Sequence, residues 1–439
     1  MDNNQGVHQT TADQHVIEVI EQTLLPSMLI DMEAVPELLK ESAGESSCCI
    51  FNVPQEACRP LVISIGPYHH GEPQLQLQML EVHKWRCLRA LLGRLQPHGI
   101  HLKDLINVMA PKEKMIRQCY SESTDNFSGS DLVKMMVLDG CYVVEFLRQI
   151  AGYVQSDDIP SNNSYMYISL VRDLLRLENQ VPYFVLEDLF ETTNVPKEMI
   201  SLTILALKFF DGIVERPVRF SVRYSNFRGM HLLDLLRLSL ITGGQQNIGP
   251  AEKSSSYELI SSASKLNQAG IAFARGEAST FLEITFDSKA GILQIPKLRI
   301  NDTLQCILHN MVAFERCFLY CDKHFTAYAM FMGSLIDTAN DAQLLCDHGV
   351  MWNDGVSKKG IASFFRDVSK DAIWDVSESY LESEIARVNS YVRRQQIRVF
   401  FTQLIYTPCR YTWSTIAAVL MLTGAIQTVY TVLQYYHPR

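Results

Sequence analysis

The chain has 439 residues, of which 47% are hydrophobic and 20% charged, and its formal net charge is −9. This is the composition of an ordinary globular protein with enough apolar residues for a sizeable core. The acidic balance disfavours a nucleic-acid-binding protein, which needs a basic surface against the phosphates.

The N-terminal part is predicted to be helical with one short strand. Residues 1–15 are polar and lack apolar periodicity, so we expect a disordered tail before a globular domain over 16–410. Short helical patterns follow over 15–40. The β-branched run LVISI at 61–65 predicts a strand that Gly66 and Pro67 end. Apolar residues three or four apart predict a helix over 75–95.

The middle of the chain continues this helical pattern. We expect Ser130 or Asp131 to cap a helix that runs to about residue 150 and is apolar on nearly all sides, which predicts a central position. Helices are also predicted over 168–177, 196–211 and 230–240, with a break before Pro182. The polar stretch 242–256 (TGGQQNIGPAEKSSS) is a candidate division between two subregions.

The C-terminal half combines one hairpin with long helices. Leu282, Ile284 and Phe286 alternate with polar residues before a glycine-containing turn and a second apolar run, which predicts a β-hairpin over 281–295. Residues 302–338 are predicted to be helical, and 378–406 form a long amphipathic helix pattern. The predicted fold is therefore mainly α with a few short strands and one hairpin.

The stretch 411–436 (YTWSTIAAVLMLTGAIQTVYTVLQYY) contains no charged residue and lies between Arg410 and Arg439. The roughly 21 residues from 413 to 433 would form a helix about 30 Å long, which matches the hydrocarbon core of a bilayer. We therefore predict a transmembrane helix over 411–436 that contacts membrane lipid. A buried core helix in a soluble protein is the alternative.

A basic cluster precedes this segment and predicts its orientation. Between residues 388 and 410 there are four arginines and no acids: Arg393, Arg394, Arg398 and Arg410. They form either a solvated helix face or a juxtamembrane cluster that contacts anionic lipid. By the positive-inside rule, the N-terminal body is expected in the cytosol. The 11 scattered cysteines are typical of reduced cytosolic thiols, and the start of the chain lacks a signal-peptide pattern, so we expect a tail-anchored protein.

Several stretches together resemble a plant family known only as domain of unknown function 247. The resemblance covers about residues 47–436, with a short spacer between residues 54 and 63 and a looser match over 349–360. The similar stretches are CCIFNVP (48–54), ISIGPYHHG (63–71), Glu81 with Lys84, MVLDGCYVVEFLR (136–148), DLLRLENQVPYFVLEDLF (173–190), HLLDLLR (231–237), AGIAF (269–273), ILQIPKLRI (292–300), AFERC (313–317) and LIDTANDAQLL (335–345).

The resemblance implies a plant membrane-associated protein without an established enzymatic activity. Some members of this family in grasses act as pollen-side determinants of self-incompatibility, which implies recognition of another molecule. The C-terminal hydrophobic segment is also similar to the usual ending of the family.

The most site-like feature of the sequence is the turn that carries His69 and His70. One interpretation is a general base or a metal ligand on a loop after a strand. The other is a turn fixed by Gly66, Pro67 and Gly71, in which a histidine bonds to nearby backbone. Three polar residues at a helix break can either complete such a site or satisfy free backbone groups; they are Glu178, Asn179 and Gln180.

Two further groups of polar residues have a structural interpretation. Asp139 and Glu145 lie in a nearly all-apolar helix, so a buried partner is expected, with Arg148 or Arg172 as candidates. A zinc site formed by the cysteines and histidines of 302–338 is disfavoured, because one continuous helix cannot surround a tetrahedral ion. That set comprises Cys306, His309, Cys317, Cys321 and His324. We expect no metal and no cofactor.

Common catalytic motifs are missing: the sequence has no GxxxxGK[ST], GxSxG, HExxH or strand-linked GxGxxG pattern. Our leading hypothesis is a membrane-anchored recognition or signalling component that acts through protein–protein contacts, with an unknown partner. The alternative is an enzyme of unknown class with a site around His69 and His70.

Overall fold

The computed structural model describes residues 48–53, 58–72, 75–154, 164–195, 200–214, 227–241, 259–370 and 379–436. For residues 75–80, 164, 397–415 and 434–436 it describes only the helical backbone. The predicted tail at 1–15, the helical patterns over 15–40 and the candidate division at 242–256 therefore lie outside the described residues, and all three remain predictions.

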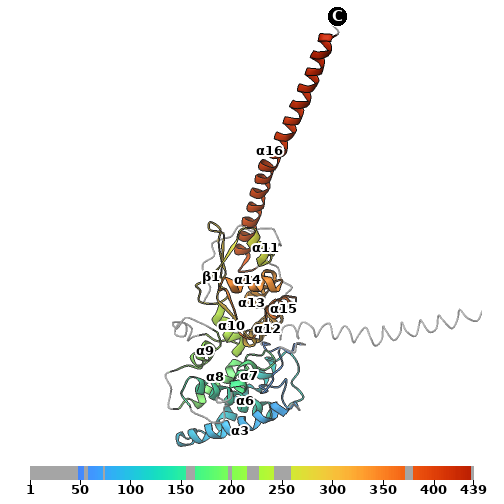
Figure 1. Cartoon of the computed structure of the whole chain (residues 1–439). Helices are drawn as coiled ribbons and strands as arrows, with labels where there is room; N and C mark the ends of the chain where they lie inside the picture. Colours follow the sequence, from blue (N-terminus) through green and yellow to red (C-terminus); the bar gives the residue numbers. More distant parts are fainter. Residues whose placement is uncertain are drawn as a thin grey trace, which may run out of the picture.

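The described chain is mainly helical, as predicted, and its body has two tiers with a long helix rising from the second (Figure 1). The first tier contains α3 (Leu75–Leu95), α4 (Leu102–Met109), α5 (Glu113–Gln118), α6 (Gly129–Ile150), α7 (Ser164–Asp173), α8 (Tyr183–Thr193) and α9 (Leu202–Asp211), with the 3₁₀ turns η3 (Gln96–His98) and η4 (Ala110–Lys112).

The second tier combines helices with short strands. Its helices are α10 (Leu232–Ile241), α11 (Ala263–Gln268), α12 (Asp302–Cys317), α13 (His324–Leu335), α14 (Ala339–Asp347) and α15 (Lys358–Lys370). Its strands are β1 (Ala272–Gly276), β2 (Thr285–Asp287), β3 (Ile292–Pro296), β4 (Leu298–Ile300) and β5 (Met351–Asn353). The rising helix is α16 (Glu382–Tyr436).

Helix α6 forms the centre of the first tier, as its nearly all-apolar sequence predicts. It packs against α3, α4, α8 and α9, and sixteen of its residues, from Leu132 to Arg148, are buried. Its helical glycine Gly140 permits a close approach of α8, because a Cβ there would lie 2.4 Å from a methyl carbon of Leu189. The helix begins two residues earlier than the nearer of the two predicted caps implies: the N-cap is Ser128, whose hydroxyl accepts the N–H of Asp131, and not Ser130 or Asp131.

The predicted hairpin is confirmed as the antiparallel pair β2–β3. Asp287 caps the turn by accepting the N–H groups of Lys289 and Ala290, and the predicted inward residues 282, 284 and 286 are buried. Strand β1 pairs with β3 in parallel on the other side, which gives the sheet order β1-β3-β2. β4 and β5 form a separate parallel pair.

Two local predictions are wrong. Residues 61–65 form no strand, because backbone N–H groups of this run donate to side chains instead of a neighbouring strand. Residues 302–338 are largely helical, as predicted, but the single continuous helix assumed for the Cys/His set is wrong: the stretch forms two helices, α12 and α13, since the chain turns between Phe318 and Lys323. The helix predicted over 75–95 is present with these bounds, and the helices predicted over 168–177, 196–211 and 230–240 are present with shifted ends where they are described.

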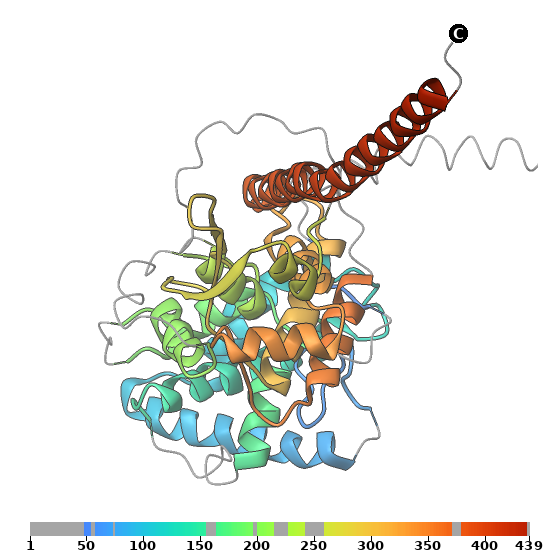
Figure 2. The same cartoon turned by 45° about the horizontal axis from the view of Figure 1, so that its top comes forward.

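Helix α16 starts on the body and leaves it without interruption. Its first turns bury Ile385 and Val388 together with the preceding Leu381, and the helix then projects away from both tiers (Figures 1 and 2). Figure 2 shows that α16 changes direction part of the way along. The predicted amphipathic segment and the predicted span are thus one helix of 55 residues.

Candidate functional site

Side chains at the end of α7 and just after it form hydrogen bonds to the ISIGPYHHG segment and to the two residues before it. The carboxylate of Asp173, which is fully buried, accepts the backbone N–H groups of Leu61, Val62 and Ile63 at 2.7–3.0 Å. Arg176 donates its Nε to the same carboxylate at 3.1 Å. Burial raises the pKa of Asp173, and the backbone donors oppose this rise.

Asn179 and Gln180 continue this attachment. The Asn179 amide accepts the N–H of Ile65 at 2.6 Å and donates to the carbonyls of Ile63 and Asp173, both at 3.0 Å. Gln180 donates to the carbonyls of Leu174 and Arg176 at 2.8 and 2.9 Å. These amides therefore satisfy backbone groups at the helix break.

Glu178 and His69 form the closest pair of titratable side chains in this segment. The His69 Nε2 atom lies 2.7 Å from one Glu178 oxygen, and the other Glu178 oxygen accepts the N–H of Val53 at 2.9 Å. The His69 Nδ1 atom lies 2.8 Å from Glu72. Arg59 donates to this same Glu72 oxygen at 3.0 Å.

The two carboxylates set the protonation of His69. Burial lowers the pKa of His69, but the hydrogen bonds to Glu178 and Glu72 outweigh burial and raise this pKa above 6.5. Since both ring nitrogens face carboxylates, the protonated ring donates on both sides. A general base requires a neutral ring nitrogen that faces a substrate, so this geometry favours a structural role for His69.

A buried lysine pairs with the central helix below the same segment. Lys84 on α3 is fully buried, donates to Asp139 of α6 at 2.7 Å, and also contacts Glu81 and the carbonyl of Ser64. The second oxygen of Asp139 accepts the N–H of Gly66 at 2.8 Å. Burial raises the pKa of Asp139, and the Lys84 charge opposes this rise.

Gly66 sits where only glycine fits. Its φ angle is +79°, and a Cβ atom there would lie 2.6 Å from the carbonyl oxygen of Gln180 and 3.1 Å from the Tyr120 hydroxyl. Tyr120 itself donates to the same carbonyl at 3.1 Å. The ISIGPYHHG segment is therefore packed directly against the LENQ segment.

Four of the five candidate residues are buried where the ISIGPYHHG and LENQ segments meet, and one is exposed. The buried four are His69, Glu178, Asn179 and Gln180, whereas His70 is exposed and lies edge-on to Phe127 at 5.7 Å. Sequence reasoning missed Asp173 and the pairing of Lys84 with Asp139. The signal for Asp173 was a single acid, beside two arginines, in the leucine-rich run LVRDLLRL.

The predicted partners of the two acids in α6 are half correct. Arg148 donates to Glu145 at 2.9 Å, as one of the alternatives predicted. Arg172 instead donates to Thr303 at 3.2 Å and pairs with Asp302 at 3.4 Å. Within the described residues, no group of three His, Cys, Asp or Glu side chains is placed to hold a metal ion.

A second buried network links α10, α12 and α13 within the second tier. Glu315 on α12 accepts Arg237 Nε at 3.2 Å, and the N–H groups of Phe325 and Thr326 at 3.1 and 2.8 Å. His231, before α10, accepts the N–H of Asp234 on Nδ1, so its Nε2–H donates to the carbonyl of Cys49 at 3.0 Å. Burial lowers the pKa of His231 to about 4, which keeps its ring neutral.

The span predicted at the C-terminus is exposed along its length. Residues Ile416–Leu433 of α16 are long and apolar enough to cross a membrane, and none of this stretch is buried against the body. Arg393 and Arg394 are exposed on the same helix nearer the body. Arg398 and Arg410 lie in α16, but their side chains are outside the described residues.

Comparison with known proteins gives a family without a known activity. A family model described as a plant protein of unknown function, DUF247, matches residues 47–424. UPF0481 protein At3g47200 of Arabidopsis thaliana is 32% identical over 388 residues, which cover 82% of this chain and 80% of the relative. A second UPF0481 protein of that plant, At3g02645, is 24% identical over 457 residues, with 81% and 84% covered. No solved structure matches.

Proposed function

The chain belongs to the DUF247 family of plant proteins of unknown function, and we propose that it is a membrane-anchored recognition component that acts through protein–protein contacts. The observation that carries the proposal is the exposed apolar end of α16. This stretch of 18 residues is uncharged, has a mean hydropathy of 1.8 and is entirely unburied; such an apolar surface is unfavourable in water, whereas a bilayer covers it.

The proposed orientation places the body in the cytosol. The supporting observation is the arginine-rich approach to the span, which includes the exposed Arg393 and Arg394. Arginines beside a span favour the cytosolic side and attract anionic lipid. The short segment after the span then faces the other side of the membrane, as in a tail-anchored protein.

Membrane extraction tests the anchor. The full chain is expected to stay in the pellet after alkaline carbonate treatment of plant membranes. Replacing Leu420 and Ile426 with arginine puts two charges in the span, each of which costs about 3 kcal/mol at a helix centre, and moves the protein to the supernatant. The matched control, Leu420→Ile with Ile426→Leu, stays in the pellet. Release of the unmodified chain contradicts the proposal.

Proximity labelling tests the recognition role. A labelling enzyme is fused to the N-terminus of the full chain, and the control fusion carries only residues 382–439. We expect the full chain to label proteins that the control does not label, because the body supplies the contacts. Identical sets of labelled proteins contradict recognition by the body. A pollen-side role in self-incompatibility is a narrower form of this proposal and requires such partners in pollen or stigma.

The second candidate function is an enzyme with its site at the His69 turn. The observation in its favour is the 2.7 Å contact between His69 and Glu178, since a carboxylate can orient a catalytic histidine. Mass-spectrometric comparison of a plant metabolite extract before and after incubation tests it. An enzyme consumes a metabolite, loses this activity in His69→Gln and keeps it in His70→Gln. If the unmodified chain, His69→Gln and His70→Gln all leave the metabolites unchanged, the result favours recognition.

A further inference from the structure

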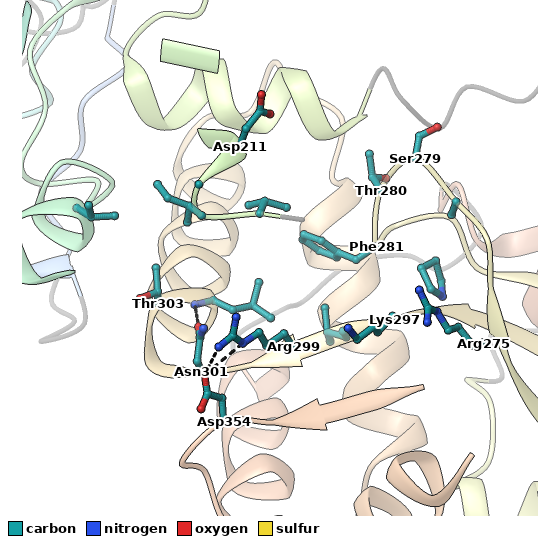
Figure 3. A pocket seen from close by; sticks show the side chains of 18 of the residues that line it. Asp211, Arg275, Ser279, Thr280, Phe281, Lys297, Arg299, Asn301, Thr303 and Asp354 are labelled. Atoms are coloured by element: carbon teal, nitrogen blue, oxygen red, sulfur yellow. Dashed lines mark hydrogen bonds and ion pairs between the residues drawn. The ribbon is translucent and has the colours of Figure 1, made fainter. Parts of the chain in front are cut away.

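A cavity of about 720 Å³ lies between the two tiers, away from the His69 turn. One wall comes from α7 and the end of α9, and the opposite wall comes from the ends of β1 and β3 together with β4 (Figure 3). Among the described residues, none of the five candidate residues of the sequence lines this cavity. Its volume is in the range of sites that bind small molecules.

The strand wall of the cavity is basic. Figure 3 shows Arg275, Lys297 and Arg299 in a row along the strands, with Asp211 on the opposite side. The register of the sheet explains the row: Arg275 pairs with Ile295, which places it near the β3–β4 link that carries Lys297. Arg299 pairs with Asp354 at 2.6 Å, and Arg275 and Lys297 are the two other basic side chains that line this wall.

A buried hydroxyl also lines the cavity. Thr280 is 3% exposed, and its Oγ1 atom forms no hydrogen bond to any described residue. The Thr280 N–H is occupied, because it donates to Glu283 at 3.1 Å. A buried polar atom without a partner is costly in a folded protein, so this hydroxyl favours a bound molecule or water that completes its hydrogen bonding.

We propose that this cavity binds a small organic acid, whose carboxylate or phosphate group contacts Arg275 and Lys297 and whose apolar body lies against Phe281. Charge-assisted hydrogen bonds to guanidinium and ammonium groups are the strong polar contacts available to such an acid. Thr280 supplies a further hydrogen bond. Apolar lining for the rest of the molecule comes from Val171, Ile213, Val214, Phe281, Leu298 and Leu304.

The charges of the cavity limit the ligand to one acid group. Asp211 and Glu277 also line it, and Asp354 neutralises Arg299. A polyanion would therefore meet repulsion from the acidic side chains, whereas one carboxylate or phosphate at the Arg275 end avoids the wall that carries Asp211 (Figure 3).

Thermal unfolding of the full chain in detergent tests the proposal with named probes. Phenylacetate and phenyl phosphate carry one acid group on an apolar ring, and phenylacetamide is the neutral counterpart. At about 10 mM, at least one acid is expected to raise the unfolding midpoint by a few degrees, since a ligand that binds only the folded state stabilises it. Phenylacetamide is expected to leave the midpoint unchanged.

Variants connect the effect to this cavity. Arg275→Gln and Lys297→Gln are each expected to weaken binding of the active probe about tenfold in calorimetric titration, because each removes a charge-assisted contact. The control Lys289→Gln changes an exposed lysine at the hairpin turn and keeps the affinity. Arg275 is exposed, so its replacement leaves the body folded. No midpoint change with either acid, an equal change with phenylacetamide, or unchanged affinity in Arg275→Gln and Lys297→Gln overturns the proposal.

Discussion

The backbone N–H of Phe286 donates to the carboxylate of Glu384 across 2.7 Å, and this bond joins the hairpin to the first turn of α16. The aromatic ring of Tyr391, two turns further along, lies edge-on to Phe286 at 5.5 Å. Tyr380 adds a hydrogen bond to the carbonyl of Leu282 at 2.9 Å. The hairpin therefore sets the direction in which α16 leaves the body.

The Glu384 contact is testable through hydrogen exchange. Replacing Glu384 with alanine removes the acceptor of the Phe286 N–H, and a hydrogen bond to a charged group contributes roughly 1.5–3 kcal/mol. We expect amide exchange at Phe286 to become at least about tenfold faster. Glu382→Ala, in the same turn but without a described contact to the hairpin, is the control and keeps the exchange rate. Equal rates in the two variants contradict this role.

Substitution of Gly66, with Gly71 as the control, tests how the ISIGPYHHG segment is packed. Both have a φ angle of +79°, but only a Cβ at Gly66 meets another atom, the carbonyl oxygen of Gln180 at 2.6 Å. Left-handed strain of about 1 kcal/mol applies to alanine at both positions, and a close contact adds to it at Gly66 alone.

We therefore expect Gly66→Ala to lower the unfolding free energy by at least about 2 kcal/mol more than Gly71→Ala. Denaturant titration of the full chain in detergent measures the difference. Equal losses in the two variants would show that the segment is not packed against Gln180.

Local periodicity predicted the helices and strands that can pack against any hydrophobic neighbour. The apolar stripes of α3 and α6 and the alternation before β3 need only a hydrophobic neighbour, so residue spacing was enough. The run 61–65 has the same β-branched composition as a strand, yet Asp173 and Asn179 occupy its backbone donors. Those side chains lie more than a hundred positions away, and no local pattern shows that they replace a strand.

Among the side chains that bind the backbone of residues 61–65, Asp173 is expected to contribute most to stability. Asparagine in its place keeps the size but turns an N–H₂ group toward backbone N–H donors, which leaves buried groups unpaired. The expected cost is about 3 kcal/mol of unfolding free energy, measured by denaturant titration. The control Asp302→Asn changes an exposed acid that pairs with Arg172, and its cost stays within about 0.5 kcal/mol. A similar small cost for Asp173→Asn contradicts the attachment.

The raised pKa of His69 predicts that its contribution to protein stability decreases as the pH rises. Its pKa in the folded protein is raised above 6.5, the value expected in the unfolded chain. The stabilisation from its charged hydrogen bonds is therefore complete below about pH 6.5 and is lost as the pH rises through the folded pKa. His69→Gln is expected to reduce the unfolding midpoint more at about pH 5.5 than at about pH 9.

The exposed His70 provides the control for this measurement. His70→Gln removes only a ring contact with Phe127 and is expected to change the midpoint by a similar small amount at both pH values. If His69→Gln costs more at the higher pH, the carboxylate pair does not hold a charged ring.

The sequence also indicated part of the candidate site. It singled out His69 and the LENQ residues because polar groups at a turn and at a helix break need partners. It did not show that these two groups are partners of each other, nor that Lys84 reaches Asp139 from another helix. The cavity was missed for the same reason: α7, α9 and the strands that line it meet only in the folded chain.

Protease protection on sealed vesicles from plant membranes tests the central claim, that α16 anchors a cytosolic body, most directly. The full chain carries one epitope tag at each end. We expect protease added outside to digest the N-terminal tag and the body, while the C-terminal tag survives until detergent opens the vesicles. Survival of the N-terminal tag in sealed vesicles, or digestion of both tags, would contradict it.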